Sequence, residues 1–359
     1  MEKQTKNKHL IRKIILIVLG IGILIGLIMP LPFYAEVPGM SMGLKKFIKI
    51  DNKKPDVDGD FNITAVTMYR VTGVTAIMAL LNPHADLLTD EQVNGGETSA
   101  NSQKINQIYM DNSLNSAEAV AFKAAGIEYK QEFNGIYVMA IQKDSKFKKY
   151  LHVGDTITKV NGETKQSTIG FQDAIRQTKI GKKVQITYLH DDKEKTVSAP
   201  TVSITSTGKK VAGVGIMLTD NTTIESATKV SADMGELGGP SGGLMFSLEL
   251  YDALSPANLA DGRTIAGTGT IDEEGNVGEI GGIDKKVISA GKNGAKIFFA
   301  PYLKVPKKYL KYEEKGMTNY ELAKKTAAKY EPQMKVVPVK TFQEAVDYLK
   351  EHPATSKAS

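Results

Sequence analysis

Strand-like and helix-like segments alternate between residues 201 and 350, and this alternation constrains the fold more than any other feature. Short runs rich in β-branched residues predict strands, and segments with apolar residues every three or four positions predict helices. The expected strands are 211–220, 263–271, 275–283, 295–301 and 335–339. The expected helices are 241–254, 284–294 and 341–350, the last of which is capped by Thr341. We therefore expect a layered α+β or α/β domain here, followed by a tail at 351–359.

Two earlier segments have the same character. The chain has 359 residues, which is enough for two or three structural units. Residues 60–71 alternate in polarity and predict a strand. Residues 115–126 predict a helix that is capped by Asn115 and ended by Gly126. Because residues 36–60 are polar and rich in Pro, Gly and Asp, we expect a linker or the start of a domain there.

The region 127–200 has the order of elements of a separate unit. A strand at 135–141 precedes a strand–turn–strand at 151–163, in which Asn161–Gly162 supplies the hairpin turn. A helix and another strand follow within 170–189. The segment VGDTITKVNG and this spacing resemble a bacterial, protease-associated PDZ domain. The alternative is a β-rich spacer without a usable groove.

The PDZ resemblance implies a groove that binds peptides by strand addition. The loop and strand of that groove would include Asn134, Gly135, Ile136, Tyr137 and Val138. The strand 136–141 would pair with the peptide, and the helix 171–178 would form the opposite wall.

The N-terminal segment predicts a membrane anchor. From Ile14 to Met29 the chain carries no charge, and its apolar character continues to Ala35. About 20 apolar residues span a bilayer core, so residues 14–35 are the expected transmembrane segment. The basic residues before it predict a cytoplasmic tail at 1–13 and an extracellular catalytic region in the cell membrane. A cleaved signal peptide is the competing interpretation, but no small-residue cleavage site is evident.

The glycine-rich segment GELGGPSGGLMF, at 235–246, fits either a phosphate loop or an exposed nucleophile. A phosphate loop needs a Gly-Lys-Ser/Thr sequence, which does not occur anywhere in the chain. The chain has no cysteine and no His-Glu-x-x-His motif, so we expect no metal site and no cofactor; a magnesium site made of carboxylates alone is the alternative that a sequence leaves open. A net charge of +6 without a dense basic run favours a solvated basic surface over nucleic-acid binding.

Nucleophilic catalysis by Ser241 is the remaining interpretation. A serine needs a base, and residues 200–350 contain no histidine. A buried lysine can act instead if burial keeps it neutral. Helical spacing places Lys286 beside the apolar face of Ile283, Val287 and Ala290, whereas Lys285, Ser289 and Lys292 are expected in water. The Thr268 hydroxyl would orient the lysine. The alternative for Ser241 is a plain helix cap.

Three segments together resemble the Lon-type protease domain. They are GGPSGGLMFSLELY, IAGTGTIDEEGNVGEIGGIDKKV and AKIFFAP. The resemblance implies Ser241 as nucleophile, Lys286 as base and Thr268 as the supporting hydroxyl. It departs from the family at Gly242, where alanine is usual. Gly238 replaces a frequent acidic residue, so a third acidic helper, Asp233 or Glu236, is in doubt.

The whole arrangement resembles the membrane-anchored PDZ–Lon proteases of Gram-positive bacteria. It implies an α+β fold in which residues 36–126 and 201–350 form a Lon-type domain, with the PDZ unit 127–200 inserted. The expected function is an ATP-independent serine endopeptidase that cleaves extracellular or membrane-proximal peptides, with the PDZ domain presenting or gating substrate. The alternative is an inactive, membrane-tethered PDZ adaptor. Because Lon relatives form rings, the resemblance also allows a homo-oligomer.

Overall fold

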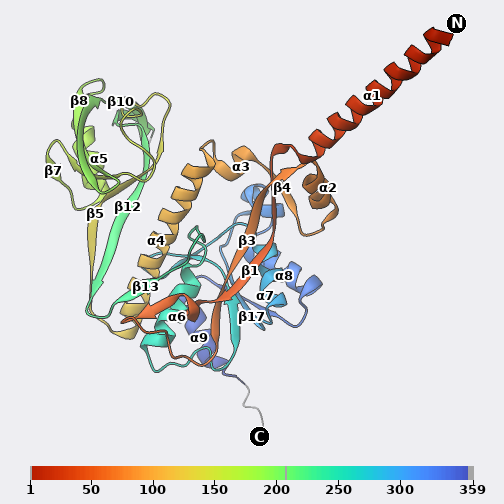
Figure 1. The fold of residues 1–359 in the computed structure, drawn as a ribbon. Coiled ribbons are helices and arrows are strands. Elements are labelled where there is room, and N and C mark those ends of the chain that lie inside the picture. The colour runs from red at the N-terminus through yellow and green to blue at the C-terminus, as the bar shows by residue number, and fades with distance from the viewer. Residues whose placement is uncertain (1, 207, 355–359) are drawn as a thin grey trace. The chain divides into compact units, whose positions relative to one another are not determined.

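A computed structural model describes residues 2–206 and 208–354, with side chains from residue 13 onward (Figure 1). The chain divides into two compact units. The first contains residues 1–40 and 65–96, and the second contains residues 41–64 and 97–359. Strands β1 (Pro30–Gly43) and β3 (Asp60–Thr72) run through the boundaries between the units. The second unit contains every residue expected in catalysis or peptide binding.

The first unit combines helices with a short strand pair. Helix α1 (Glu2–Ile28) leads into β1, and β1 pairs antiparallel with β4 (Asp86–Thr89). Helix α2 (Gly73–Leu81) and helix α3 (Asp90–Asn94) each begin with a capping box, at Thr72 and Thr89 respectively. Such boxes satisfy backbone N–H groups that a helix start leaves open. A small core of Ala35, Val71 and Ala79 holds the unit together.

The expected transmembrane anchor is not supported. Across 2–206 and 208–354, the structure contains no helix whose length and apolar content would let it cross a bilayer. The apolar stretch 14–35 is divided, because α1 ends at Ile28 and a strand begins at Pro30, which cannot continue a helix. From Ile14 to Ile28 the helix rises about 22 Å, against a bilayer core of about 30 Å. The expected location in the cell membrane, with a cytoplasmic tail and an extracellular catalytic domain, is therefore not supported.

The ends of the chain are described only in part. Of the expected N-terminal tail, 1–13, residue 1 and the side chains of 2–12 lie outside the described residues. Of the expected C-terminal tail, 351–359, residues 355–359 lie outside them as well.

The second unit is built on parallel strands covered by helices on both faces. Its strand order is β18 (Lys335–Val339), β17 (Ile297–Pro301), β14 (Thr264–Gly267) and β3, with parallel pairing throughout. Side chains of successive strand residues point to opposite faces. Accordingly, Ile265 and Phe299 pack into one core, whereas Ala266 and Phe298 pack into another.

Helices α4 (Ser99–Ala125), α6 (Gly243–Leu254) and α9 (Phe342–Glu351) contribute to the first of these cores. Helices α7 (Ile283–Lys292) and α8 (Asn319–Tyr330) contribute to the second. Short elements connect this frame: β2 (Ile48–Ile50) pairs with β13 (Val230–Ala232), and β15 (Thr270–Ile271) pairs with β16 (Val277–Gly278). Three 3₁₀ turns complete it, at Leu44–Lys46, Lys307–Tyr312 and Glu314–Gly316.

Helix α4 begins much earlier than the sequence suggested. Asn115 is not its cap, because the helix begins at Ser99 and the Thr98 side chain accepts a hydrogen bond from the Asn101 N–H. The expected end is confirmed: Gly126 adopts the left-handed conformation that glycine favours. This long helix packs against α6 along the core.

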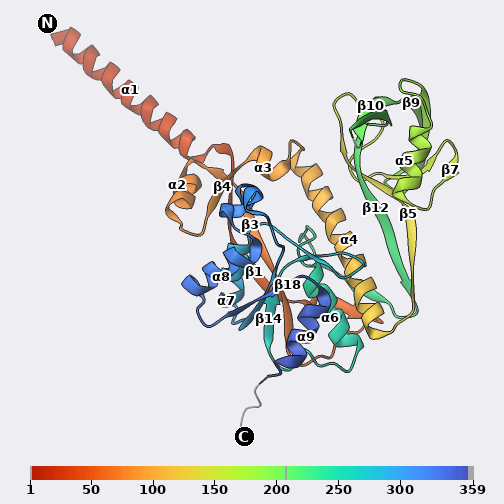
Figure 2. The ribbon, with the colours of Figure 1, turned by 180° about the vertical axis from the view of Figure 1, so that it is seen from behind.

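A second sheet lies between α4 and β13 in the sequence. Its order is β12 (Ile216–Ser226), β5 (Tyr129–Ile141), β6 (Thr156–Val160), β8 (Lys183–His190) and β9 (Lys193–Pro200). Strand β7 (Glu163–Thr164) pairs with β6, and β10 (Val202–Ser206) pairs with β11 (Lys209–Gly213). Helix α5 (Thr168–Arg176) buries Phe171 and Ile175 against the sheet. The views from both sides show β5 and β12 as two long strands that lie side by side and pair antiparallel (Figure 2). The expected hairpin turn is present, since Asn161 and Gly162 both have positive φ.

Candidate functional site

Ser241 lies on a turn directly before α6, half-buried beside helix α4. Two residues of α4 hold the turn: the Gly239 N–H donates to the Asn106 carbonyl at 2.7 Å, and the Ser113 hydroxyl donates to the Pro240 carbonyl at 3.0 Å. A Cβ on Gly243 would lie 2.6 Å from Ile271 Cγ2 and 2.7 Å from Ser113 Oγ. A larger residue at 243 would therefore push α6 away from its neighbours.

The structure brings Lys286 to Ser241. Lys286 lies in the first turn of α7, is 4% exposed, and places its Nζ 2.8 Å from Ser241 Oγ. The residue before the helix is Gly282, which adopts the left-handed conformation (φ 68°) that glycine tolerates best. The expected inner face is confirmed, because Ile283, Val287 and Ala290 are all buried in the same core.

Thr268 links both groups. It follows β14 and is completely buried, and its Oγ1 accepts a hydrogen bond from Lys286 Nζ at 3.2 Å. The same hydroxyl donates to the Ser241 carbonyl at 3.0 Å, which also accepts from the Gly269 N–H at 2.9 Å. The Thr268 N–H is fixed in turn by the Phe299 carbonyl of β17, at 3.1 Å. The end of β14, from which Thr268 follows, therefore positions the serine and the lysine relative to each other.

Lys285 does not face water as expected. It is 1% exposed, and its Nζ lies 3.2 Å from Asp284 Oδ1 and 3.8 Å from Glu314 Oε1. Although burial opposes ionisation of Asp284, Lys315 and Lys285 hold the pKa of its carboxyl below the ordinary value. Ser289 is also buried, whereas Lys292 is exposed as expected. The sequence did not show that a second layer of structure covers this side of α7.

The two acidic residues considered as a third helper are both exposed. Asp233 uses its carboxylate locally, since Oδ1 accepts a hydrogen bond from the Gly235 N–H at 3.2 Å. Glu236 follows on the same exposed loop. The residues that sequence reasoning missed are Asn106 and Ser113, because nothing in a polar helical stretch indicated which of its side chains would meet the serine turn.

The expected peptide strand lies inside its sheet. At Ile136 and Tyr137, β5 pairs with β6 on one side and with β12 on the other. A peptide that added to this strand would have to displace one of them. Position 135 requires glycine, because its φ is 138° and a Cβ there would lie 2.3 Å from the Ile157 carbonyl oxygen. Strand β12, which the sequence analysis placed in the following domain, forms the edge of this sheet.

A cavity of about 180 Å³ lies between α4, β13 and α6. Its wall is mixed: Ile48, Leu114 and Leu250 contribute apolar surface, and Asp111, Asn115 and Glu118 contribute polar groups. Burial raises the pKa of the Glu118 carboxyl to about 7, although the charge of Lys229 opposes this rise. Leu114 in its wall directly follows Ser113 on α4, so the cavity lies close to the contact between α4 and the serine turn.

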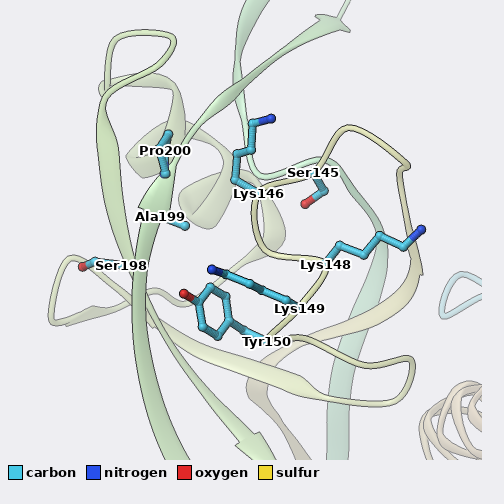
Figure 3. A pocket seen from close by; sticks show the side chains of 8 residues that line it. All are labelled: Ser145, Lys146, Lys148, Lys149, Tyr150, Ser198, Ala199 and Pro200. Atoms are coloured by element: carbon cyan, nitrogen blue, oxygen red, sulfur yellow. The ribbon is translucent and has the colours of Figure 1, made fainter.

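A larger hollow of about 580 Å³ lies in the second sheet region, between the segment 145–150 and the end of β9 (Figure 3). Lys149 extends along the Tyr150 ring, with Nζ 4.9 Å from its centroid, whereas Lys146 and Lys148 point away from it. None of the residues expected in catalysis or peptide binding lines this hollow.

Comparison with known proteins identifies one domain. A profile of the PDZ domain family matches residues 124–201. The PDZ domain of an SdrC-like protein from Listeria monocytogenes is 35% identical and covers 24% of this chain and 88% of that one, with a TM-score of 0.23. The corresponding domain from Listeria innocua is 33% identical and covers 23% of this chain and 92% of that one, with a TM-score of 0.22.

The protease resemblance has narrower support. A Lon protease of Mesomycoplasma hyopneumoniae is 32% identical over 111 residues, which are 31% of this chain and 11% of that protein. The chain thus spans about a tenth of the length of the relative it matches. Together with the mixed α+β fold, these matches describe a PDZ-containing protein that is related to proteases or binds peptides.

Proposed function

We propose that the chain is a serine endopeptidase in which Ser241 is the nucleophile and Lys286 the general base. The observation that carries the proposal is the 2.8 Å approach of a buried lysine amine to the serine hydroxyl. Burial disfavours the charged form of a lysine, and a neutral amine is the form that can accept the serine proton. Thr268 orients the amine through its hydroxyl.

The residues account for both halves of the reaction. As Ser241 Oγ attacks the peptide carbonyl carbon, its proton moves to Lys286 Nζ. The ammonium then gives this proton to the leaving amine as the C–N bond breaks, which leaves an ester on Ser241. Lys286 next takes a proton from the water that attacks the ester, and it returns this proton to Ser241 Oγ as the acid product leaves. No step consumes a nucleotide.

Backbone N–H groups beside the nucleophile are candidates for stabilising the oxyanion. Within the part of the chain that the structure describes, the N–H groups of Ser241 and Gly242 make no hydrogen bond, whereas those of Gly239, Gly243 and Leu244 are engaged. Both candidates precede the first turn of α6, where the helix dipole favours negative charge. Donors aimed at the developing charge contribute strongly to catalysis of acyl transfer.

We further propose that the PDZ domain presents or gates substrate through β12 rather than through β5. An edge strand offers backbone groups to which a peptide can add, and because α4 already binds the carbonyls of Asp220 and Thr222, a peptide would add to β12 beside these contacts. Helix α4 connects this strand with the serine turn: Asn112 and Asn115 donate to the carbonyls of Asp220 and Thr222 at 3.1 and 2.6 Å, and Ser113 donates to Pro240. A peptide on β12 can thereby affect the geometry of Ser241.

The test measures cleavage of an unfolded protein such as reduced casein by the full chain, without nucleotide, using mass spectrometry of the products. Ser241→Ala and Lys286→Met should each abolish cleavage. The matched controls, Ser231→Ala and Lys292→Met, change exposed residues and should cleave like the wild type. Cleavage should also increase with pH until the lysine is neutral. If Ser241→Ala cleaves like the wild type, the assignment of the nucleophile fails. If the folded wild type does not cleave at all, the peptide-binding adaptor, which the PDZ match favours, takes the place of the protease.

A further inference from the structure

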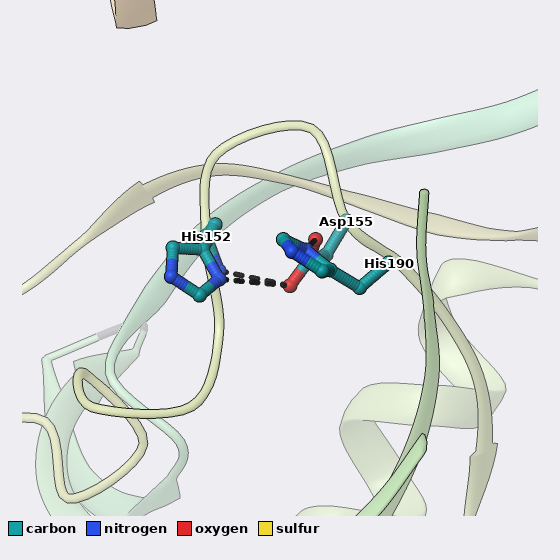
Figure 4. A group of neighbouring side chains, drawn as sticks. All are labelled: His152, Asp155 and His190. Carbon is teal, nitrogen blue, oxygen red and sulfur yellow. Dashed lines mark hydrogen bonds and ion pairs between the residues drawn. The ribbon is translucent and has the colours of Figure 1, made fainter. Parts of the chain in front are cut away.

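Two histidines and one carboxylate lie together in the PDZ domain, apart from the residues proposed for catalysis. His152 and Asp155 belong to the turn before β6, and His190 is the last residue of β8. The two imidazole rings have centroids 4.7 Å apart and planes inclined by 38°. One donor atom from each of the three residues lies within 4.8 Å of the other two (Figure 4).

The carboxylate of Asp155 contacts both histidines and holds them in this arrangement. It is buried, and its Oδ1 lies 2.7 Å from His190 Nδ1. Its Oδ2 accepts the His152 backbone N–H at 2.8 Å and lies 3.9 Å from His152 Nδ1. A carboxylate has about four acceptor positions, so both oxygens keep capacity for another partner.

The other side of the cluster is open. The His152 side chain is 62% exposed, so an ion can enter and the ring can adjust without disturbing the core. Asp191, which follows on the β8–β9 turn, places Oδ2 3.6 Å from His190 Nε2 and offers a further oxygen at the opening. Two imidazoles with carboxylate oxygens form a donor set that suits zinc and its first-row neighbours better than magnesium or calcium.

We propose that His152, Asp155 and His190 form a binding site for a divalent transition-metal ion, with Zn²⁺ as the probe. The ligands come from two separate segments, so a bound ion ties the turn before β6 to the β8–β9 hairpin. The same turn is bonded to β5, since the Val138 N–H donates to the Asp155 carbonyl and the Gly154 N–H donates to the Val138 carbonyl. An ion that binds only the folded domain stabilises it by mass action.

The test titrates Zn²⁺ into the full chain, without a histidine tag and after removal of metal by a chelator, and follows binding by calorimetry. We expect one ion per chain at micromolar affinity or tighter, and no binding of Mg²⁺ under the same conditions. His152→Ala and His190→Ala should each weaken binding at least ten-fold. The matched control is His352→Ala, an exposed histidine after α9, which should bind like the wild type.

Circular dichroism of each variant shows whether it is folded. The change in melting temperature on adding Zn²⁺ then shows whether the folded variant still binds the ion. The wild type should gain thermal stability with Zn²⁺, and the folded His152→Ala variant should lose this gain. The proposal is overturned if the wild type binds no Zn²⁺. It is equally overturned if the folded His152→Ala and His190→Ala variants bind Zn²⁺ as tightly as the wild type, since the ion would then lie elsewhere.

Discussion

The buried carboxyl of Glu249, in the helix that follows Ser241, makes the stability of the fold depend on pH in a way that can be predicted and measured. It lies in the middle of α6, is 0% exposed, and neither carboxyl oxygen has a hydrogen-bond partner among the described residues. Burial raises its pKa to about 7, although the nearby Phe61 N–H, which faces it without forming a regular hydrogen bond, partly opposes the rise. The negative charges of Asp252 and Asp60 add to the increase.

The sign of the effect on stability follows from this shift. Between the ordinary value of 4.5 and about 7, the folded chain keeps a proton on Glu249 that the unfolded chain has lost. Stability therefore falls as the pH rises through this window. Each unit of pKa shift corresponds to about 1.4 kcal/mol, so the free energy of unfolding should decrease by roughly 2 to 3 kcal/mol between pH 5 and pH 8 through this group alone.

Glu249→Gln keeps the size of the side chain and removes its ionisation. We expect the variant to lose this share of the pH dependence. The difference in free energy of unfolding between the variant and the wild type should therefore favour the variant more at pH 8 than at pH 5. Urea unfolding followed by circular dichroism at both pH values measures the difference, and Glu274→Gln, at an exposed position, is the control. If Glu249→Gln and the wild type respond identically to pH, the buried carboxyl does not titrate as argued.

The other predictions concern the serine turn and its connections. Thr268→Val removes both hydrogen bonds of the hydroxyl, so kcat for peptide cleavage should fall at least ten-fold with little change in KM; Thr268→Ser should restore it, and a Val variant with normal kcat would contradict the orienting role. Gly242→Ala should retain activity within a few-fold, because the backbone at Gly242 is unstrained and the new Cβ, which also touches Ile63 Cγ2 at 3.5 Å, requires only a small shift of the Phe246 ring edge, now 2.9 Å away; a hundred-fold loss would show that the glycine is required. Asn115→Ala breaks the 2.6 Å bond to β12 and should reduce any effect of PDZ-bound peptides on the cleavage rate, with peptide affinity unchanged; an unaltered response would exclude this connection.

The elements that the sequence predicted well are those with strong local signals. Gly126 ends α4, Asn161–Gly162 forms a hairpin turn, and Thr341 caps α9 by accepting from the Glu344 N–H. Lys286 was selected by its helical spacing from the apolar face of Ile283, Val287 and Ala290 and by the Lon-type resemblance, and the structure places that lysine beside Ser241. Its catalytic role remains a proposal.

The failures share a different cause, because each depended on a distant partner. Lys285 is buried by its contact with Glu314, which is far along the chain and has no counterpart in the helical pattern. The start of α4 was missed because a polar stretch with weak periodicity becomes helical when it packs against α6. The pairing of β5 with β12 joins segments about 80 residues apart, and no local signal shows which strand will be at the edge.

The order of the chain gives a physical reason for a PDZ domain in this position. The sheet begins with β5 directly after α4 ends, and its last strand, β12, is followed by β13 and then by the turn that carries Ser241. Side chains of α4 contact both β12 and the serine turn, at Asn115 and Ser113. A displacement of β12 can thus reach Ser241 by two routes, through the helix and through the segment 227–240. Since a hydroxyl must stay within hydrogen-bond distance of its base, a shift of about 1 Å at this turn is enough to change the rate substantially.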